Sequence, residues 1–506
     1  MTLPTDGTHT IPAALEAAAQ RFGSRPAYVE GGITTTYADL LARVREAARR
    51  YVALGVEPGD RIALWAPNSV DWVVAGLGIS YAGGTLVPIN SRYTGHEAAD
   101  LVSRSAARVV VVDDGFLGRT QAADLEAAGV SARIVTLHES DTHLALCSVD
   151  ATHVAVDVVI DRADAVTPDD VADILFTSGT TGRPKGAMTA HRQTVGVARV
   201  WGELGGVTES DRYLVVNPFF HSFGYKVGIV TALLTGATLY PVAAFDVDAV
   251  MTLIEDERIT VLPGAPTIYQ SLLTAPGRDK HDLSSLRLAV TGAAVVPVVL
   301  IERMRASPDE GGLGIDTVVT AFGMTEAVVV SMARDGDPAE LVASTCGRAI
   351  PGMEVMLGTG DELLVRGEFV MLGYLDDPAA TAEAIDADGW LHTGDIATLD
   401  ADGNLRITDR LKDMYICGGF NVYPAEVEQV LMRMPGVSDV AVVGVPDERM
   451  GEVGKAYVVG SASPDDLVAY AKEHLANFKV PRFVELVEAL PRNPSGKVLK
   501  TELRQA

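Results

Sequence analysis

The sequence predicts an α/β protein with a large, layered N-terminal domain and a small C-terminal domain. Helical and strand-like spacings of apolar residues alternate as far as Val290, a pattern typical of sheets with crossover helices. Beyond Glu354, short strand-like runs and tight turns take over. At 506 residues the chain is also too long for one ordinary core. We therefore expect several α/β layers, a β-rich part and a small α+β unit at the C-terminus.

The N-terminal elements follow from where apolar residues recur. A first helix is expected from Ile11, behind Thr10 as its cap. A second is expected over residues 37–54, followed by strands at 61–65, 85–88 and 108–112.

The longest uncharged run, residues 72–91, has the length of a membrane span. Gly83, Gly84 and Pro88 interrupt it, so we interpret it as a buried helix followed by a strand. We expect no stable membrane insertion.

Residues 115–167 are polar, rich in alanine and only weakly periodic. Within them, His138, Glu139, Asp141 and His143 suggest a metal site as one interpretation. They lie in a loop-like run without a regular ligand period, so we favour a solvated surface loop.

A glycine-rich stretch after residues 171–176 is the most informative part of the chain. An apolar run ends there in hydroxyl residues, glycines and a lysine, which together allow backbone N–H groups and side chains to surround an anion. The spacing fits neither G-x-x-x-x-G-K-[ST] nor G-x-G-x-x-G, and a flexible surface turn is the alternative. The candidate phosphate-binding residues are Thr177, Ser178, Gly179, Thr180, Thr181, Gly182 and Lys185.

The overall charge limits the possible ligands. Lys and Arg total 41 against 67 Asp and Glu, a net charge of −26, which argues against nucleic acid and anionic membranes as partners. An anionic ligand must therefore meet a local basic pocket. The cysteines, Cys147, Cys346 and Cys417, are scattered, and no signal peptide is evident, so we expect a cytoplasmic location.

Three further strand ends carry unusual residues. Because α/β proteins bind ligands at the carboxyl ends of strands, residues 217–224, 291–294 and 321–326 are candidate walls of one pocket. Beyond them, residues 400–403 predict a hairpin turn, and residues 425–475 predict a new small α/β pattern, which belongs to a second domain of about a hundred residues.

Six motifs in order resemble the acyl-adenylate-forming superfamily, in particular AMP-forming acyl-CoA synthetases, over essentially the whole chain. They are residues 176–186, 218–224, 322–326, 389–395, 409–424 and 491–497. The resemblance implies an acid–CoA ligase that joins a carboxylate to AMP from ATP, releasing pyrophosphate, and then passes the acyl group to coenzyme A. It implies ATP, Mg²⁺ and coenzyme A as cofactors.

The resemblance also implies roles for particular residues. The loop would hold the triphosphate, Glu326 with Thr181 would bind Mg²⁺, and Phe322 would stack on adenine where relatives have Tyr. Relatives also have Gln at the position of Thr320. Asp395 would hold the ribose, with Arg410 nearby, and Lys497 would bridge the carboxylate and the α-phosphate. Gly292, Ala293, Ala294, Gly323, Met324 and Thr325 would complete the nucleotide wall.

His221, between Phe220 and Phe223, resembles the gate beside the acyl pocket, whose wall would include Gly292 and Ala294. An aromatic-packed core histidine is the alternative. Lys412 resembles the hinge between a large domain, residues 1–411, and a small domain, residues 412–506, that rotates between the two half-reactions. Rotation would remove Lys497 and bring Gly418 and Gly419 to a passage for pantetheine.

Within the family, residues 217–226, 262–270 and 414–421 resemble actinobacterial ligases that activate the bicyclic hydrindanedione propanoate left by steroid (cholesterol) ring degradation. A medium-chain or aryl acyl-CoA synthetase, an enzyme that loads a carrier protein, and a non-catalytic nucleotide-binding sensor are the alternatives. The expected partners are the acid, ATP and CoA, and a homodimer is compatible with the sequence without being required by it.

Overall fold

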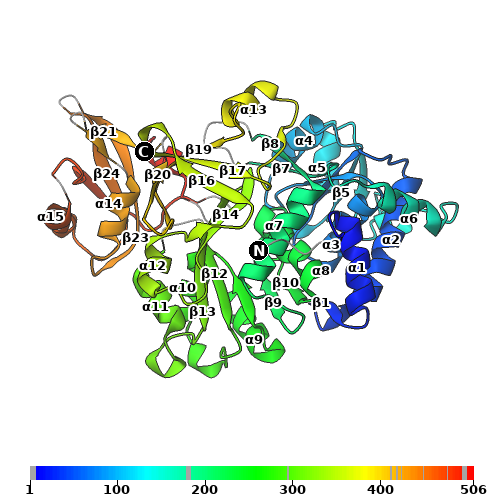
Figure 1. The fold of residues 1–506 in the computed structure, drawn as a ribbon, viewed down its shortest axis with the longest axis horizontal. Coiled ribbons are helices and arrows are strands. Elements are labelled where there is room, and N and C mark those ends of the chain that lie inside the picture. Colours follow the sequence, from blue (N-terminus) through cyan, green and yellow to red (C-terminus); the bar gives the residue numbers. More distant parts are fainter. Residues whose placement is uncertain are drawn as a thin grey trace.

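The computed structural model describes residues 7–177, 184–292, 296–410, 413–417, 420–422, 424–447, 450–475, 477–492 and 498–505. Its strands form two large sheets, a small antiparallel sheet and a C-terminal sheet (Figure 1). This arrangement confirms the predicted α/β layers, β-rich part and small C-terminal unit.

The first large sheet carries the glycine-rich stretch near one edge. Its strands from β7 to β6 are parallel, whereas β8 and β18 run antiparallel at the edge. β4 and β5 are buried at every position, as expected of parallel strands covered on both faces. The order is β18 (Gly373–Tyr374), β8 (Gly186–Ala190), β7 (Val171–Phe176), β4 (Thr85–Pro88), β3 (Arg61–Trp65), β5 (Val109–Val112) and β6 (Arg133–Thr136).

The N-terminal hairpin, residues 26–36, forms one edge of the second large sheet. It joins the sheet where Tyr28 pairs with Leu239 of the neighbouring parallel strand. The central strands of the sheet are parallel, and β14 turns back antiparallel to β13. The order is β15 (Arg348–Ala349), β14 (Ala327–Met332), β13 (Thr317–Met324), β12 (Leu288–Gly292), β11 (Val261–Pro263), β9 (Arg212–Val215), β10 (Thr238–Pro241), β1 (Pro26–Glu30) and β2 (Ile33–Thr36).

Helices cover the two sheets and enclose two apolar cores, a large one shared by both sheets and a smaller one on the other face of the first sheet. α3 (Val70–Tyr81) is buried at almost every position, which explains its uniformly apolar sequence. Thr10 caps α1 (Ile11–Phe22) by accepting from the Ala13 N–H group, as predicted. The other helices here are α2 (Tyr37–Ala53), α4 (Gly95–Arg104), α7 (His191–Leu204), α8 (Thr231–Thr235), α9 (Val247–Glu257), α10 (Pro266–Thr274), α11 (Val298–Arg305) and α12 (Ala339–Ser344).

The weakly periodic region 115–167 holds more regular structure than its sequence indicates. It contains α5 (Gln121–Ala127), the edge strand β6 and α6 (Val156–Ala165). These elements are short and partly exposed, so their apolar spacing is faint. The segment that holds His138 and His143 is a loop, as expected.

The small antiparallel sheet forms the predicted β-rich part. It is built from β16 (Met353–Leu357), β17 (Glu362–Gly367), β19 (Leu391–Leu399) and β20 (Leu405–Arg410), beside α13 (Pro378–Ala384). Ala397 pairs with Ile407 across the predicted hairpin.

The C-terminal part packs around cores of its own. Residues 415–503 form two apolar clusters, one of which surrounds Val442 and the other Val443. Figure 1 shows this part at one end of the molecule. A domain boundary at Lys412 stays a prediction, because residues 411 and 412 lie outside the described ranges. The elements are β21 (Tyr415–Cys417), β22 (Phe420–Val422), α14 (Pro424–Leu431), β23 (Val437–Asp447), β24 (Gly451–Gly460), α15 (Pro464–His474), β25 (Phe483–Leu486) and α16 (Lys500–Leu503).

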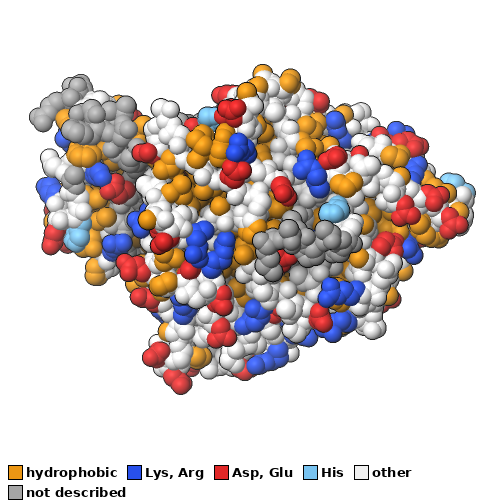
Figure 2. Space-filling model, viewed as in Figure 1, with side chains coloured by type: hydrophobic (Ala, Val, Ile, Leu, Met, Phe, Trp, Pro, Cys, Tyr) orange, Lys and Arg blue, Asp and Glu red, His pale blue; other side chains and the backbone are white. Residues whose placement is uncertain are grey.

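Charge is spread over the molecular surface. Figure 2 shows acidic and basic side chains intermingled on this face, so the net charge of −26 is not concentrated in one patch there. Within the described ranges, no helix has both the length and the apolar character needed to cross a membrane.

Candidate active site

The glycine-rich stretch is the tip of a hairpin. β7 and β8 pair antiparallel up to Phe176 and Gly186, and the Thr177 N–H group then donates to the Lys185 carbonyl at 2.8 Å. The Lys185 N–H group donates back to Thr177 Oγ1 at 3.2 Å. Because the next helix, α7, begins only at His191, an anion held here would depend on the loop's own N–H groups, hydroxyls and lysine.

Several predicted residues lie outside the described residues, and their roles stay predictions. They are Ser178, Gly179, Thr180, Thr181, Gly182, Ala293, Ala294, Lys412, Gly418, Gly419 and Lys497, together with the side chain of Arg410.

A second hairpin presents the predicted nucleotide wall. Phe322, Gly323 and Met324 end β13, and Thr325 and Glu326 turn the chain into β14. A Cβ atom at Gly323 would lie 1.9 Å from the Val328 carbonyl oxygen, so only glycine allows this close pairing.

Thr320, where relatives have Gln, has a structural role in this hairpin. It is buried, and its hydroxyl contacts the carbonyl oxygens of Val342 and Thr345 at 2.8 Å each. Its side chain therefore connects β13 to α12 and to the residue that follows this helix.

Tyr374 joins the two hairpins and was not predicted. Its hydroxyl donates to Glu326 Oε1 at 2.8 Å, and Lys185 Nζ lies 4.9 Å from the centre of its ring. Burial, together with the adjacent Glu326 carboxylate, raises the pKa of Tyr374 above its ordinary value, so the hydroxyl stays a donor. Lys185, the predicted phosphate ligand, and Glu326, the predicted metal ligand, thus contact the same tyrosine side chain.

The remaining predicted nucleotide residues gather around the same hairpin. Gly292, at the end of β12, is the register partner of Ala321, next to Phe322. Phe322 pairs with Ser331, whose hydroxyl donates to the Cys346 carbonyl at 2.9 Å. The Cys346 N–H group donates to the Leu405 carbonyl of β20 at 2.6 Å, and β20 pairs with β19, which carries Asp395.

Asp395 is 4% exposed and lies in β19, where its backbone pairs with Arg410 of β20. Its N–H group donates to Thr393 Oγ1 at 3.1 Å. A nearly buried carboxylate on a paired strand is a fixed acceptor, as a ribose contact requires.

His221 follows β9 and has an accessible side chain, although the protein around it lowers the pKa of its ring. This accessibility does not fit the alternative of an aromatic-packed core histidine. Its Nδ1 accepts from the Phe223 N–H group at 3.2 Å, which leaves the neutral ring with its proton on Nε2. This orientation is suited to an accessible donor, and the gate role stays a prediction.

Comparison with known proteins identifies the family. Residues 15–375 match the AMP-binding enzyme family, and residues 426–497 match the AMP-binding enzyme C-terminal domain. The chain belongs to the AMP-binding enzyme family.

The relatives of this AMP-binding enzyme include two CoA ligases that are named for the same bicyclic propanoyl group. The 3-[(3aS,4S,7aS)-7a-methyl-1,5-dioxo-octahydro-1H-inden-4-yl]propanoyl:CoA ligases of Rhodococcus jostii and Mycobacterium tuberculosis are 55% and 53% identical to it, over 99% and 98% of both chains. The crystal structure of ATP-bound MatB from Rhodopseudomonas palustris matches with a TM-score of 0.84 and 29% identity, over 98% of both chains. These matches confirm the predicted fold, the predicted resemblance and the class of acid–CoA ligase.

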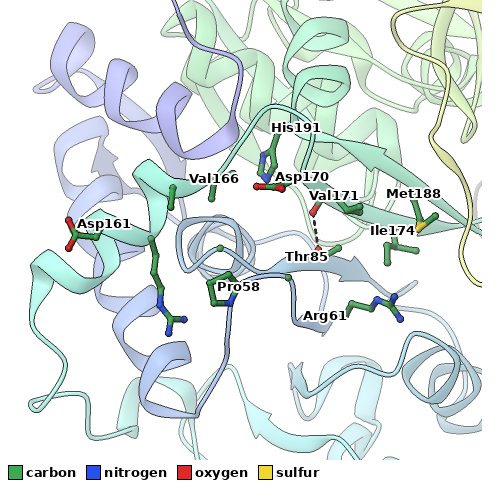
Figure 3. A pocket seen from close by; sticks show the side chains of 14 residues that line it. Pro58, Arg61, Thr85, Asp161, Val166, Asp170, Val171, Ile174, Met188 and His191 are labelled. Atoms are coloured by element: carbon green, nitrogen blue, oxygen red, sulfur yellow. Dashed lines mark hydrogen bonds between the residues drawn. The ribbon is translucent and has the colours of Figure 1, made fainter.

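The AMP-binding enzyme also has a cavity away from this site. It has a volume of about 480 Å³ and is lined by Arg61, Thr85 and Val171, which begin β3, β4 and β7 (Figure 3). It therefore lies at the amino ends of these strands, opposite the loop that follows β7. Burial lowers the pKa of His191, in its wall, to about 4, so this ring is neutral.

The histidines of the 138–143 loop have separate acidic partners. His138 lies 3.5 Å from Asp71 and from Asp113, and His143 lies 3.1 Å from Glu126. Among the residues that the structure describes, no three or more His, Cys, Asp or Glu side chains are grouped to hold a metal ion.

Proposed function

We propose that this AMP-binding enzyme converts the bicyclic hydrindanedione propanoate to its CoA thioester. In the first half-reaction, a carboxylate oxygen attacks the α-phosphorus of ATP and pyrophosphate leaves. In the second, the CoA sulfur attacks the acyl carbonyl and AMP leaves. The observation that carries the substrate is more than 50% identity, over nearly the whole chain, to two ligases named for this acid.

The described residues supply the electrostatics that the first half-reaction needs. Two anions must meet, so positive charge and fixed donors must surround the phosphates. Lys185 closes the base of the loop through its two hydrogen bonds with Thr177. Phe322 and Asp395 are held on the paired strands β13 and β19, which supports their assignment to the nucleotide. We assign the triphosphate to the loop, adenine to Phe322 and ribose to Asp395.

The residues fit a Mg²⁺ ion. Mg²⁺ is usually bound by one or two carboxylates together with substrate phosphates and water, so the single carboxylate of Glu326 meets its needs. Glu326 is 9% exposed and oriented by the Tyr374 hydroxyl at 2.8 Å. Bound there with Thr181, the ion would neutralise charge on the phosphates.

The second half-reaction depends on residues outside the described ranges. By resemblance, we assign the hinge to Lys412, the adenylation lysine to Lys497 and the pantetheine passage to Gly418 and Gly419. If so, Lys497→Ala abolishes acid-dependent pyrophosphate exchange but spares thioester formation from supplied acyl-adenylate. Equal loss of both would contradict the assignment. A homodimer and a cytoplasmic location stay predictions.

The substrate is tested by measuring CoA thioester formation with the bicyclic propanoate, a medium-chain fatty acid and an aryl acid at equal concentration. We expect kcat/KM to be highest for the bicyclic acid. A higher value for either other acid refutes the substrate. Acylation of a holo-carrier protein without free CoA thioester would refute the acceptor.

A further inference from the structure

A charged pair lies in the core behind the phosphate loop. Lys226 Nζ lies 2.9 Å from Asp173 Oδ1, and both side chains are 0% exposed. The same ammonium donates to Thr189 Oγ1 at 3.0 Å, while the Thr194 hydroxyl donates to Asp173 Oδ2 at 2.8 Å. None of these residues has a role in the half-reactions above.

The pair connects the two segments that should meet the two substrates. Asp173 and Thr189 are register partners across the hairpin whose tip is the phosphate loop. Lys226 belongs to η3 (Phe223–Val230), the helical segment that follows His221. One ammonium group therefore spans both strands of the loop hairpin and the acyl-side segment.

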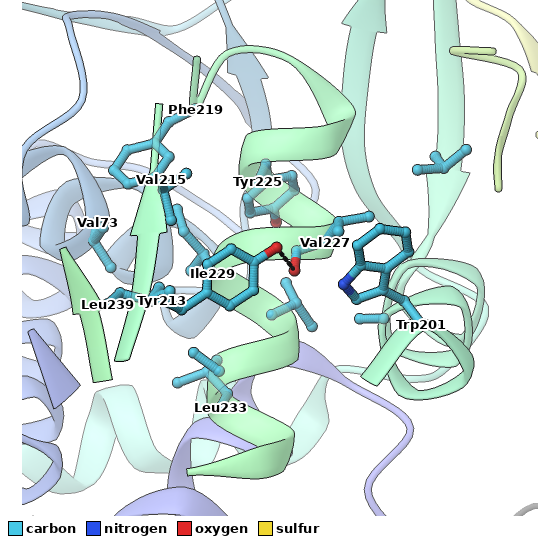
Figure 4. Close-up of a cluster of buried hydrophobic side chains, with 14 of the residues drawn as sticks. Val73, Trp201, Tyr213, Val215, Phe219, Tyr225, Val227, Ile229, Leu233 and Leu239 are labelled. Carbon is cyan, nitrogen blue, oxygen red and sulfur yellow. Dashed lines mark hydrogen bonds between the residues drawn. The ribbon is translucent and has the colours of Figure 1, made fainter. Parts of the chain in front are cut away.

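The backbone around Lys226 is unusual. The Thr231 N–H group donates to the Lys226 carbonyl, five residues back, so the helix is widened into a π turn there. Such turns are often found at functional sites. Buried apolar side chains line this segment, among them Tyr225 and Val227, the sequence neighbours of Lys226 (Figure 4).

Stability alone does not account for this pair. Removing two ions from water costs several kcal/mol each, and buried pairs can often be replaced by apolar side chains without loss of stability. Burial lowers the pKa of Lys226, although Asp173 opposes this effect. What apolar contacts would not provide is a fixed distance and direction between η3 and the hairpin.

We propose that Lys226 is a positioning residue that sets the distance between the acyl-side segment, residues 221–230, and the phosphate-loop hairpin. It thereby aligns the carboxylate of the bound acid with the α-phosphate of ATP. This inference rests on the proposed function, because it needs an acid on one segment and ATP on the other.

The test compares two double variants that each remove a whole ion pair. Asp173→Asn/Lys226→Met removes this one. Asp211→Asn/Arg287→Met removes an ion pair at 2.6 Å, in which Asp211 is 2% exposed. Asp211 immediately precedes β9 and Arg287 immediately precedes β12, so this pair lies at the opposite end of these strands from Gly292. We measure acid-dependent pyrophosphate exchange, KM for acid and ATP, and the unfolding midpoint of each full-length protein.

For the Asp173/Lys226 double variant, we expect kcat/KM for the acid to fall about 100-fold, the cost of a misplacement of roughly 1 Å. KM for ATP should change less than about threefold, and the preference for a bulky over a short acid should decrease. The Asp211/Arg287 double variant should keep its kcat/KM and its acid preference.

Wild-type kcat/KM in the first double variant overturns the proposal, as does an equal loss in both. If the first does not fold, Thr189→Val decides, because it removes only one contact of the ammonium. We expect it to raise KM for the acid at least threefold, and an unchanged value overturns the proposal. If the wild-type enzyme prefers another acid, the substrate assignment fails, and the same comparison is made with that acid.

Discussion

The stack of cation, tyrosine and glutamate at the site has a counterpart elsewhere in the molecule. At the site, Lys185 lies 4.9 Å from the ring centre of Tyr374, whose hydroxyl donates to Glu326. In the second stack, at the start of β9, Arg212 lies 5.0 Å from the ring centre of Tyr240, whose hydroxyl donates to Glu257 at 3.1 Å.

The two stacks differ in whether their charges meet. Arg212 forms an ion pair with Glu257, so the charges of the second stack neutralise each other. Among the described contacts, no ion pair joins Lys185 to Glu326, and the tyrosine separates them. The charges of the second stack therefore satisfy each other, whereas those at the site stay apart, as the proposed contacts of Lys185 with phosphate and of Glu326 with Mg²⁺ would require.

The largest difference in activity is expected between variants of the two glutamates. Glu326→Gln should lower acid-dependent pyrophosphate exchange more than about 100-fold, because a metal ligand matters more than the outer partners whose loss costs 10–100-fold. Glu257→Gln should leave the rate of the folded enzyme unchanged. Both are measured at saturating ATP over a range of Mg²⁺. Similar losses would mean that the stacks do not differ in function.

The two tyrosines come next. Tyr374→Phe keeps the ring beside Lys185 but removes the hydroxyl that orients Glu326, so we expect about a 10-fold loss of pyrophosphate exchange and a higher Mg²⁺ requirement. Tyr240→Phe is the matched control and should keep normal kinetics. An unchanged Mg²⁺ requirement in Tyr374→Phe would exclude the orienting role.

Replacing the two cations should affect stability in the opposite order to activity, so that the second stack loses more stability than the stack at the site. Arg212→Met breaks an ion pair that also includes a hydrogen bond, and should lower the free energy of unfolding by about 1–2 kcal/mol. Within the described ranges, the Lys185 side chain contacts the Tyr374 ring alone, so Lys185→Met should lose less than about 1 kcal/mol. Urea unfolding measures both. A larger loss for Lys185→Met would show that its charge is neutralised within the fold.

The smallest effect concerns what the stacks share. Burial is the main cause that raises the pKa of both Tyr374 and Tyr240 in the folded protein. Above the unfolded value of about 10, the unfolded chain loses these protons first, so the folded state loses stability as pH rises. Tyr374→Phe and Tyr240→Phe should each lose less stability than wild type between about pH 9 and 11. An identical loss in wild type and both variants would contradict the raised values.

The sequence predicts those site residues that lie in continuous motifs. The phosphate loop, Glu326 and Asp395 are recognisable because neighbouring residues in the chain also serve the site. Tyr374 is 48 residues from Glu326 and belongs to a two-residue strand, so no local pattern marks it. Its place is decided by the pairing of β18 with β8.

Lys226 illustrates a different difficulty. A lysine within an apolar helical run is visible in the sequence, but its partners Asp173 and Thr189 lie on strands of another sheet. The π turn depends on which carbonyl the Thr231 N–H group meets, and that is settled by packing rather than by apolar spacing. The short elements of residues 115–167 escaped prediction because their exposed faces blur the period.

The way the two large sheets share the chain also affects how the enzyme is made. Tyr28 can pair with Leu239 only after Leu239 has been synthesised. At ribosomal rates of about 5–20 residues per second, the pairing of this edge is delayed by roughly 10–40 s. The first sheet receives β18, and with it Tyr374, later still. The nascent chain therefore emerges with unpaired strand edges, and the ring that joins Lys185 to Glu326 is synthesised only after both of them.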